Sequence, residues 1–93
     1  MTSAAPVICV VIPAYKVREH VLGVIDCIPA SVSRIYVVDD ACPDHSGDFV
    51  QAHCSDARVQ VLRNPVNLGV GGAVVAGYAQ ALADQADIVV KVD

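Results

Sequence analysis

The chain has 93 residues, a net charge of −4, no Trp, one Phe and three Tyr. This length predicts one small domain over residues 1–93, and its core must be aliphatic because large aromatic residues are almost absent. The six Lys and Arg residues form no basic run that could displace counterions from phosphates, which excludes a nucleic-acid surface.

Apolar β-branched runs alternate along the chain with segments of helical periodicity. Val7–Ile12 is expected to be a buried strand that Pro13 ends, because proline cannot donate to a sheet ladder. A helix is expected over Glu19–Ile28 and a second buried strand over Arg34–Asp40. The later elements are expected to be a helix with Asp44 or Ser46 as its N-cap that runs to about Cys54, a strand over Arg58–Leu62, a loop over Asn64–Leu68, a helix over Gly69–Ala83 and a strand over Asp87–Asp93.

This alternation of strands and helices predicts the fold class. Crossover connections of this length demand parallel strands joined with right-handed geometry. We therefore predict a three-layer α/β/α domain whose four-stranded parallel sheet has the strand order 3-2-1-4. Small residues at every fourth position of the last helix predict a flat stripe that lets it approach the sheet closely; they are Gly69, Ala73, Gly77 and Ala81.

Acidic residues stand where predicted strands end. Asp39 and Asp40 follow the second strand and Asp93 ends the fourth, while Tyr15 follows the first. The carboxyl ends of parallel strands share one edge, where such sheets bind ligands. Carboxylates there suit a divalent cation that bridges to phosphates, or acceptors for a base or a ribose. The alternative is that Asp39 and Asp40 are a solvated turn residue and a helix cap, and that Asp93 is solvated.

The segment from Asn64 to Gly72 is a second candidate site. It ends at a predicted helix N-terminus, where unpaired N–H groups hold anions. A dinucleotide-binding fingerprint is excluded, because Val74 stands where its third glycine belongs. The alternative is a loop followed by helix-packing glycines. Lys16 and Arg63 are the cations nearest these strand ends.

Cysteine usage and hydropathy indicate in which cellular compartment the protein is expected. The four cysteines are expected to be reduced, buried thiols of a cytoplasmic protein; they are Cys9, Cys27, Cys42 and Cys54. A zinc site built from Cys42, His45, His53 and Cys54 matches no common finger spacing. The uncharged stretch Asn64–Ala83 contains too many polar residues and glycines for a membrane span, and the N-terminus lacks a secretory signal.

Four segments in this order and spacing resemble family-2 inverting glycosyltransferases of the GT-A fold, above all the polyprenyl-phosphate mannose or glucose synthases. The segments are Val11–Tyr15, Val37–Asp40 with Asp44, Asn64–Gly69 and Ala86–Asp93. The resemblance covers the whole chain, and only the combination of segments makes it specific. It implies the half-Rossmann N-terminal part of such an enzyme. The implied activity is transfer of a sugar from UDP or GDP to a polyprenyl phosphate or a growing glycan.

The resemblance also implies roles for individual residues. Residues matching Pro13, Ala14 and Tyr15 line the base pocket, the acid matching Asp40 accepts a hydrogen bond from the base, and Asp39 supports that pocket. Asn67 and Gly69 match a loop near the diphosphate and ribose. Asp93 matches the first acid of an Asp-x-Asp motif that holds Mg²⁺ or Mn²⁺ on the diphosphate.

Three departures from the family pattern affect the expected preference for nucleotide and sugar. Lys16 follows Tyr15 where Asn is usual, and Ala41-Cys42 replaces the Gly-Ser of the turn after the second strand. Val70 stands where a Lys or Arg is common, so one phosphate cation is missing.

No residue of the chain is predicted to be the catalytic base. The base, the acceptor site and the rest of the metal motif are expected beyond Asp93 in a longer enzyme, either free in the cytoplasm or associated with a membrane, so the 93-residue chain is expected to be inactive. The alternative is a non-catalytic nucleotide-binding or assembly domain that forms a homodimer through the exposed edge of the fourth strand. A Rossmann oxidoreductase is disfavoured, because Pro13–Tyr15 stands where its glycines would follow the first strand.

Overall fold

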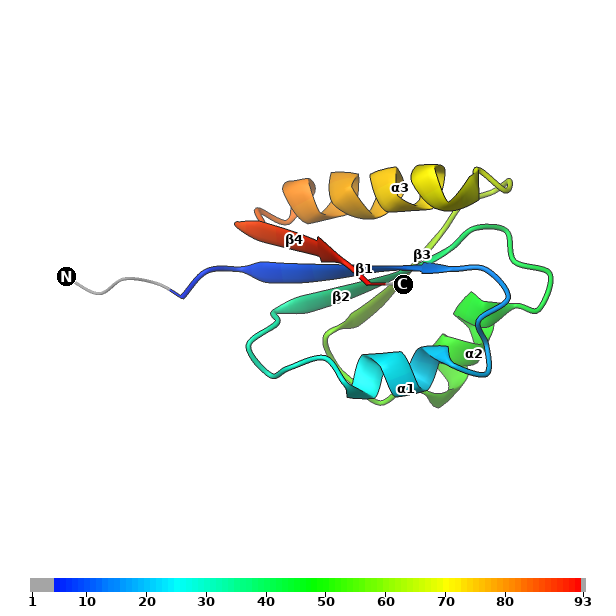
Figure 1. Ribbon diagram of the computed structural model, residues 1–93, viewed down its shortest axis with the longest axis horizontal. Helices are drawn as coiled ribbons and strands as arrows, with labels where there is room; N and C mark the ends of the chain where they lie inside the picture. Colours follow the sequence, from blue (N-terminus) through cyan, green and yellow to red (C-terminus); the bar gives the residue numbers. More distant parts are fainter. Residues whose placement is uncertain (1–4, 93) are drawn as a thin grey trace.

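Four parallel strands form the middle layer of the chain in the computed structural model, which describes residues 5–92. The strand order is β3-β2-β1-β4, as predicted. Helices α1 and α2 cover one face of the sheet and α3 covers the other (Figure 1), which confirms the three layers. The elements are β1 Ile8–Ala14, α1 Val21–Asp26, β2 Arg34–Asp39, α2 Ser46–His53, β3 Val59–Arg63, α3 Gly69–Ala83 and β4 Ile88–Lys91.

The prediction that Pro13 ends the first strand is wrong, because β1 continues through it to Ala14. Pro13 pairs with Val38 in the parallel ladder to β2. The carbonyl of Val11 accepts a hydrogen bond from Val92, so alternation turns the ring nitrogen of Pro13 toward the β4 side of the strand. Within the described residues the ladder to β4 stops at the pair Val11–Lys91, so no ladder bond is lost there.

Helix α1 is shorter than its predicted range, beginning two residues after Glu19 and ending before Cys27. The N–H groups of Cys27 and Ile28 bond to carbonyls three residues back, at 3.1 Å each, so the helix tightens into a turn before Pro29. Helix α2 begins at Ser46, and its N-cap is His45, so the prediction that Asp44 or Ser46 is the N-cap is wrong.

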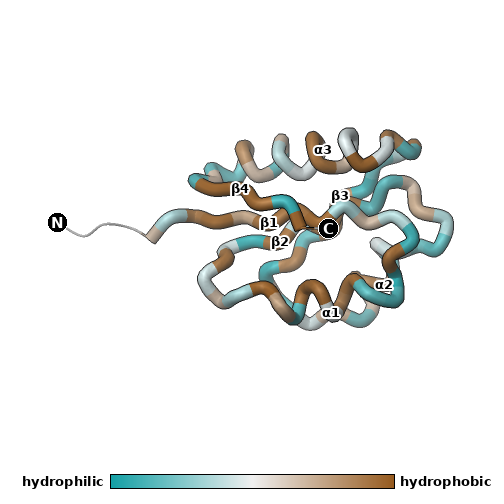
Figure 2. The backbone as a smooth tube through the Cα atoms, in the orientation of Figure 1, coloured by the Kyte–Doolittle hydropathy of each residue, from teal (hydrophilic) through white to brown (hydrophobic). Residues whose placement is uncertain are grey.

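Alternating side chains of β1 and β2 build two separate cores, one on each face of the sheet. The strand residues are apolar on both faces, as expected for a central parallel sheet (Figure 2). Val10, Ile12, Ile35 and Val37 pack with residues of α1 and α2, including Ile25. On the other face, Cys9, Val11, Tyr36 and Val38 pack with Ala73 and Ala81 of α3.

Close approach of α3 to the sheet depends on the small-residue stripe. Ala73, Gly77 and Ala81 are buried, as predicted, whereas Gly69 is exposed. A Cβ atom at Gly77 would lie 2.3 Å from Cγ1 and 3.2 Å from Cβ of Val11. Rotating the Val11 side chain cannot relieve a contact with its Cβ, so a larger residue at position 77 would push the helix off the strand.

A buried hydroxyl fixes the other end of α3. The Tyr36 side chain is fully buried in β2 and donates a hydrogen bond of 2.5 Å to Asp84, the residue that ends α3. Burial and this bond raise the pKa of Tyr36, so the hydroxyl stays protonated. The helix therefore has one defined position over β1 and β2.

We predict that Gly77→Ala destabilises the fold by about 1–3 kcal/mol through overpacking, despite the better helix propensity of alanine. Gly71 is the control, since a Cβ there meets nothing within 4 Å and Gly71→Ala should stabilise by up to ~1 kcal/mol. Urea unfolding of both variants measures the difference. Equal effects at the two positions would contradict the packing argument.

Candidate functional site

Asp39 closes the turn between β2 and α2. Its carboxylate, 6% exposed, accepts hydrogen bonds from the backbone N–H groups of Cys42 (2.8 Å) and Gly47 (2.9 Å). A Cβ atom at Gly47 would lie 2.5 Å from Asp39 Oδ2, so only glycine permits this approach. Arg63 lies 3.6 Å from the same oxygen. Asp39 thus acts as the cap considered among the sequence alternatives.

Asp40 holds the loop between β3 and α3. Its carboxylate, 3% exposed, accepts hydrogen bonds on Oδ1 from the Asn64 side chain (2.8 Å) and the Leu68 N–H (2.9 Å). Burial raises the pKa of Asp40, but these bonds and one from the Gly69 N–H outweigh burial and lower it. Asp40 is therefore a carboxylate at neutral pH, although it is almost inaccessible to bulk water.

A cavity of about 180 Å³ brings most of the predicted base-pocket residues together. Tyr15, 41% exposed, and Asp40 line it from the ends of β1 and β2. The full lining is Pro13, Ala14, Tyr15, Val17, Asp40, Val70 and Ala73. The cavity therefore offers an aromatic ring and one charged acceptor among mainly apolar walls.

The other predicted residues lie outside this cavity. Asp39 lines a neighbouring polar pocket of about 250 Å³ with Cys42, Arg63 and others. Asn67 and Gly69 are exposed, and the Asn67 side chain accepts a 3.0 Å bond from the Gly69 N–H. Asp93, the predicted metal ligand, lies outside the described residues.

Left-handed backbone conformations cluster in the loops at this edge of the sheet. Lys16, Ala41 and His45 have φ angles of 57°, 54° and 58°, and Gly69 has 78°. Each non-glycine residue in this region costs about 1–2 kcal/mol. Strained residues of this kind gather at functional sites, where the surrounding structure enforces their conformation.

The cations and metal-ligating residues near the cavity are largely engaged. Arg63 bonds to Asp48 at 2.8 Å and to Gln51, and Lys16 Nζ lies 5.5 Å from the centre of the Tyr15 ring. Within residues 5–92, no group of three or more His, Cys, Asp or Glu side chains could hold a metal ion. Cys42, His45, His53 and Cys54, considered from the sequence as a zinc set, are not gathered into such a group in this part of the chain.

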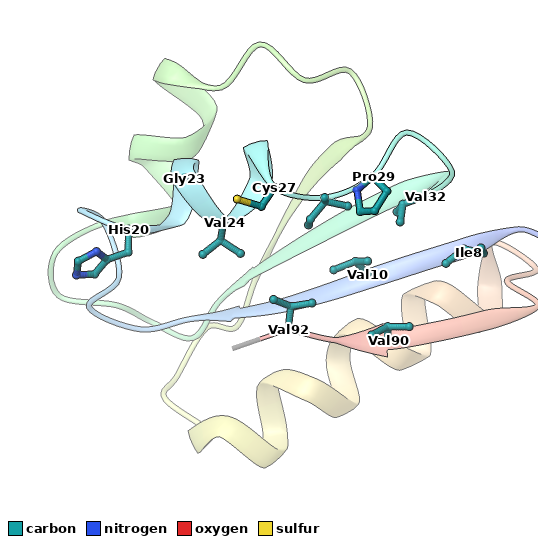
Figure 3. A pocket seen from close by; sticks show the side chains of 11 residues that line it. Ile8, Val10, His20, Gly23, Val24, Cys27, Pro29, Val32, Val90 and Val92 are labelled. Carbon is teal, nitrogen blue, oxygen red and sulfur yellow. The ribbon is translucent and has the colours of Figure 1, made fainter.

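A larger groove, of about 680 Å³, lies on the α1 side of the sheet. Its apolar side chains come from α1 and the loop after it and from β1 and β4, including Val10, Val24, Val90 and Val92 (Figure 3). Cys27 also lines this groove and is exposed, so the expectation that all four cysteines are buried is wrong for it.

Among the described residues, no helix has the length and apolar character needed to cross a membrane.

The residues that hold Asp40 in place were not predicted from the sequence. Asn64 was assigned to a loop, and nothing marked its side chain as a donor to a carboxylate 24 positions earlier. The contact between Cys42 and the loop after β1 was also missed, because it joins two loops of irregular backbone. The parallel order of β1, β2 and β3 was the available signal, since it places these loops side by side.

We predict that the chain loses stability in acid through Asp40. Its folded pKa is lowered, so its contribution is fully present above the unfolded value of about 3.9 and is lost as pH falls through the folded pKa. Asp40→Asn should flatten the dependence of the unfolding free energy on pH below about 4. Asp26→Asn is the control, an exposed carboxylate without a hydrogen bond among residues 5–92. An unchanged slope in Asp40→Asn would contradict the assignment.

Comparison with known proteins shows the family. The model of glycosyl transferase family 2 matches residues 9–93. Undecaprenyl-phosphate mannosyltransferase of Micrococcus luteus is 36% identical over 88 residues, which cover 89% of this chain and 35% of that protein. Dolichol-phosphate mannosyltransferase of Pyrococcus furiosus is 31% identical over 81 residues, 83% of this chain and 23% of that protein. The chain thus spans about a third or less of these relatives, and it belongs to glycosyl transferase family 2.

Proposed function

We propose that this chain binds the nucleotide of a UDP- or GDP-linked sugar for a glycosyltransferase that transfers the sugar with inversion. The observation that carries the proposal is the cavity shared by Tyr15 and Asp40 at the carboxyl edge of the sheet. An aromatic face and a buried carboxylate are the two groups that a nucleobase requires, one for stacking and one for its N–H edge.

The charge state of Asp40 gives the site a preference among bases. Hydrogen bonds from Asn64 and Leu68 occupy Oδ1 and help keep the carboxyl ionised. An ionised carboxylate accepts but does not donate, so it favours bases that present a ring N–H. Uracil and guanine have such a group next to a carbonyl, whereas adenine and cytosine present an unprotonated ring nitrogen there.

A divalent cation fits the proposed chemistry, but Asp39 and Asp40 are not the residues that we expect to bind it. The carboxylates of Asp39 and Asp40 are committed to N–H donors, which orient them away from a metal role. Asp93 is the residue that we propose would hold Mg²⁺ or Mn²⁺. Such an ion would neutralise the departing nucleoside diphosphate.

The acceptor and the setting are proposed from the relatives. Their names specify undecaprenyl phosphate and dolichol phosphate as acceptors. We therefore propose a polyprenyl phosphate acceptor for the whole protein, ahead of a growing glycan, and a cytoplasmic site of action at a membrane surface. The 93-residue chain should not catalyse transfer alone, because the one buried carboxylate in its cavity is held by Asn64 and Leu68 rather than placed as a base.

We predict that the chain binds UDP or GDP in preference to ADP and CDP, and that Tyr15→Ala weakens binding at least about tenfold, the value of one stacked base. Tyr78→Ala is the control, a similarly exposed tyrosine on α3 that lines none of the site cavity. Amide NMR titration, with and without Mg²⁺, measures both affinity and location, with shifts expected at Tyr15, Asp40 and Asn67–Gly69. A folded spectrum without shifts at millimolar nucleotide, or equal effects of the two tyrosine variants, would overturn the proposed site.

An assembly domain is the second candidate function, and the open edge of β4 favours it. Ile88 and Val90 are 46% and 44% exposed, and Val90 also lines the apolar groove of Figure 3. Within the described residues the sheet ladder of β4 runs to β1 alone, which makes β4 an edge strand of the kind that can pair with a second copy.

If this edge forms a homodimer, Val90→Lys should convert it to a monomer, because a charge on an edge strand opposes pairing. Val75→Lys is the control, an exposed valine on the outer side of α3. Sedimentation velocity of the wild type and both variants decides the matter. A monomeric wild type at high micromolar concentration would exclude assembly through β4.

A further inference from the structure

The loop that follows β1 contacts two side chains of the loop that follows β2, the thiol of Cys42 and the carboxyl of Asp44, which receives the Arg18 N–H. The backbone N–H of Lys16 donates a hydrogen bond to Cys42 Sγ at 2.9 Å. Cys42 is buried, whereas Lys16 is exposed, so the bond joins an exposed loop to the interior of the next one. The two residues are 26 positions apart in the chain.

The thiol also contacts Asp44 and Ser46 Oγ, the latter at 3.5 Å, and these groups belong to a wider set of hydrogen bonds in the turn. The Cys42 N–H donates to Asp39, the thiol donates to Asp44, and Ser46 Oγ also donates to Asp44 at 2.7 Å. Hydrogen bonds from Cys42 and Ser46 lower the pKa of Asp44, so this carboxyl is an acceptor at neutral pH. Because the S–H is committed to Asp44, the sulfur lone pairs are the part of the thiol that meets Lys16.

This contact lies beside the cavity of the proposed nucleotide site. Lys16 is in the left-handed region at φ 57°, and the residue before it is Tyr15, which lines the cavity opposite Asp40. A non-glycine residue keeps such a conformation only when its surroundings enforce it. At Lys16 itself, the N–H bond to the thiol ties this backbone to the interior of the turn, and the Arg18 N–H bond to Asp44 follows two residues later.

We propose that Cys42 is a positioning residue, whose thiol fixes the Tyr15–Lys16 backbone so that the Tyr15 ring stands ready to stack on a base. The inference rests on the proposed function. Cys42 does not touch the base in this scheme: it lines the neighbouring polar pocket and acts through Lys16. A sulfur atom that only filled space would make the same packing contacts without receiving the N–H.

This positioning role requires a hydrogen-bond acceptor in the side chain at position 42. A conservative substitution that keeps an acceptor should therefore preserve nucleotide binding. Cys42→Ala removes the acceptor, and nucleotide should bind about fivefold more weakly, the worth of one neutral hydrogen bond. Cys42→Ser keeps an acceptor and an O–H donor for Asp44, so its affinity should stay within about twofold of the wild type. Cys54→Ala is the control, because it truncates a half-buried thiol that makes no contact with the Tyr15–Lys16 segment.

Calorimetric titration with UDP and GDP measures the affinities, urea unfolding measures stability, and hydrogen exchange of the Lys16 amide reports the contact itself. The expected result is faster exchange and weaker binding in Cys42→Ala alone, at a stability equal to that of Cys54→Ala. Wild-type affinity in folded Cys42→Ala, or failure of Cys42→Ser to restore binding, would overturn the proposal. If the wild type binds neither nucleotide, the proposed function fails, and equal Lys16 exchange in wild type and Cys42→Ala would then overturn the positioning contact separately.

Discussion

The end of β2 is the constraint on which the candidate site depends. Alternation along a strand sends neighbouring side chains to opposite faces, so the consecutive acids Asp39 and Asp40 serve two different loops. Asp39 binds the N–H groups at the start of α2, and Asp40 binds Asn64 and Leu68 ahead of α3. Two buried carboxylates side by side would repel each other in an apolar core. Here each one accepts stabilising hydrogen bonds from N–H groups of the loop that it holds. The strand thereby organises both loops of the sheet edge.

The layers and the strand order were predictable from the sequence, because they depend on apolar runs and on the handedness of crossovers rather than on individual contacts. The proposed base pocket was expected from the resemblance rather than from the pattern of residues. Periodicity placed Tyr15 and Asp40 at strand ends, but it did not show that they share one cavity while Asp39 and Asn67 lie outside it. Those distinctions depend on side-chain direction in irregular backbone, which no period of 2 or 3.6 residues encodes.

The errors of prediction have local physical causes. Pro13 continues β1 because its ring nitrogen faces away from β2, so the ladder between β1 and β2 loses no hydrogen bond. Helix α1 is short because tight turns at Cys27 and Ile28 lead into Pro29. A proline therefore ends a strand only where its nitrogen faces a strand that would have received the hydrogen bond.

Backbone strain gathers mainly at the carboxyl edge of the sheet. Lys16, Ala41 and His45 have left-handed conformations there, and Gln85 is the one described non-glycine residue of this kind at the opposite end, between α3 and β4. A domain of this size has a small net stability, so four strained residues consume a large fraction of it. The close packing of α3, and of β2, whose side chains are buried on both faces of the sheet, offsets that cost. In this arrangement rigidity is supplied by the core, and the loops at the carboxyl edge hold conformations that no isolated peptide would keep.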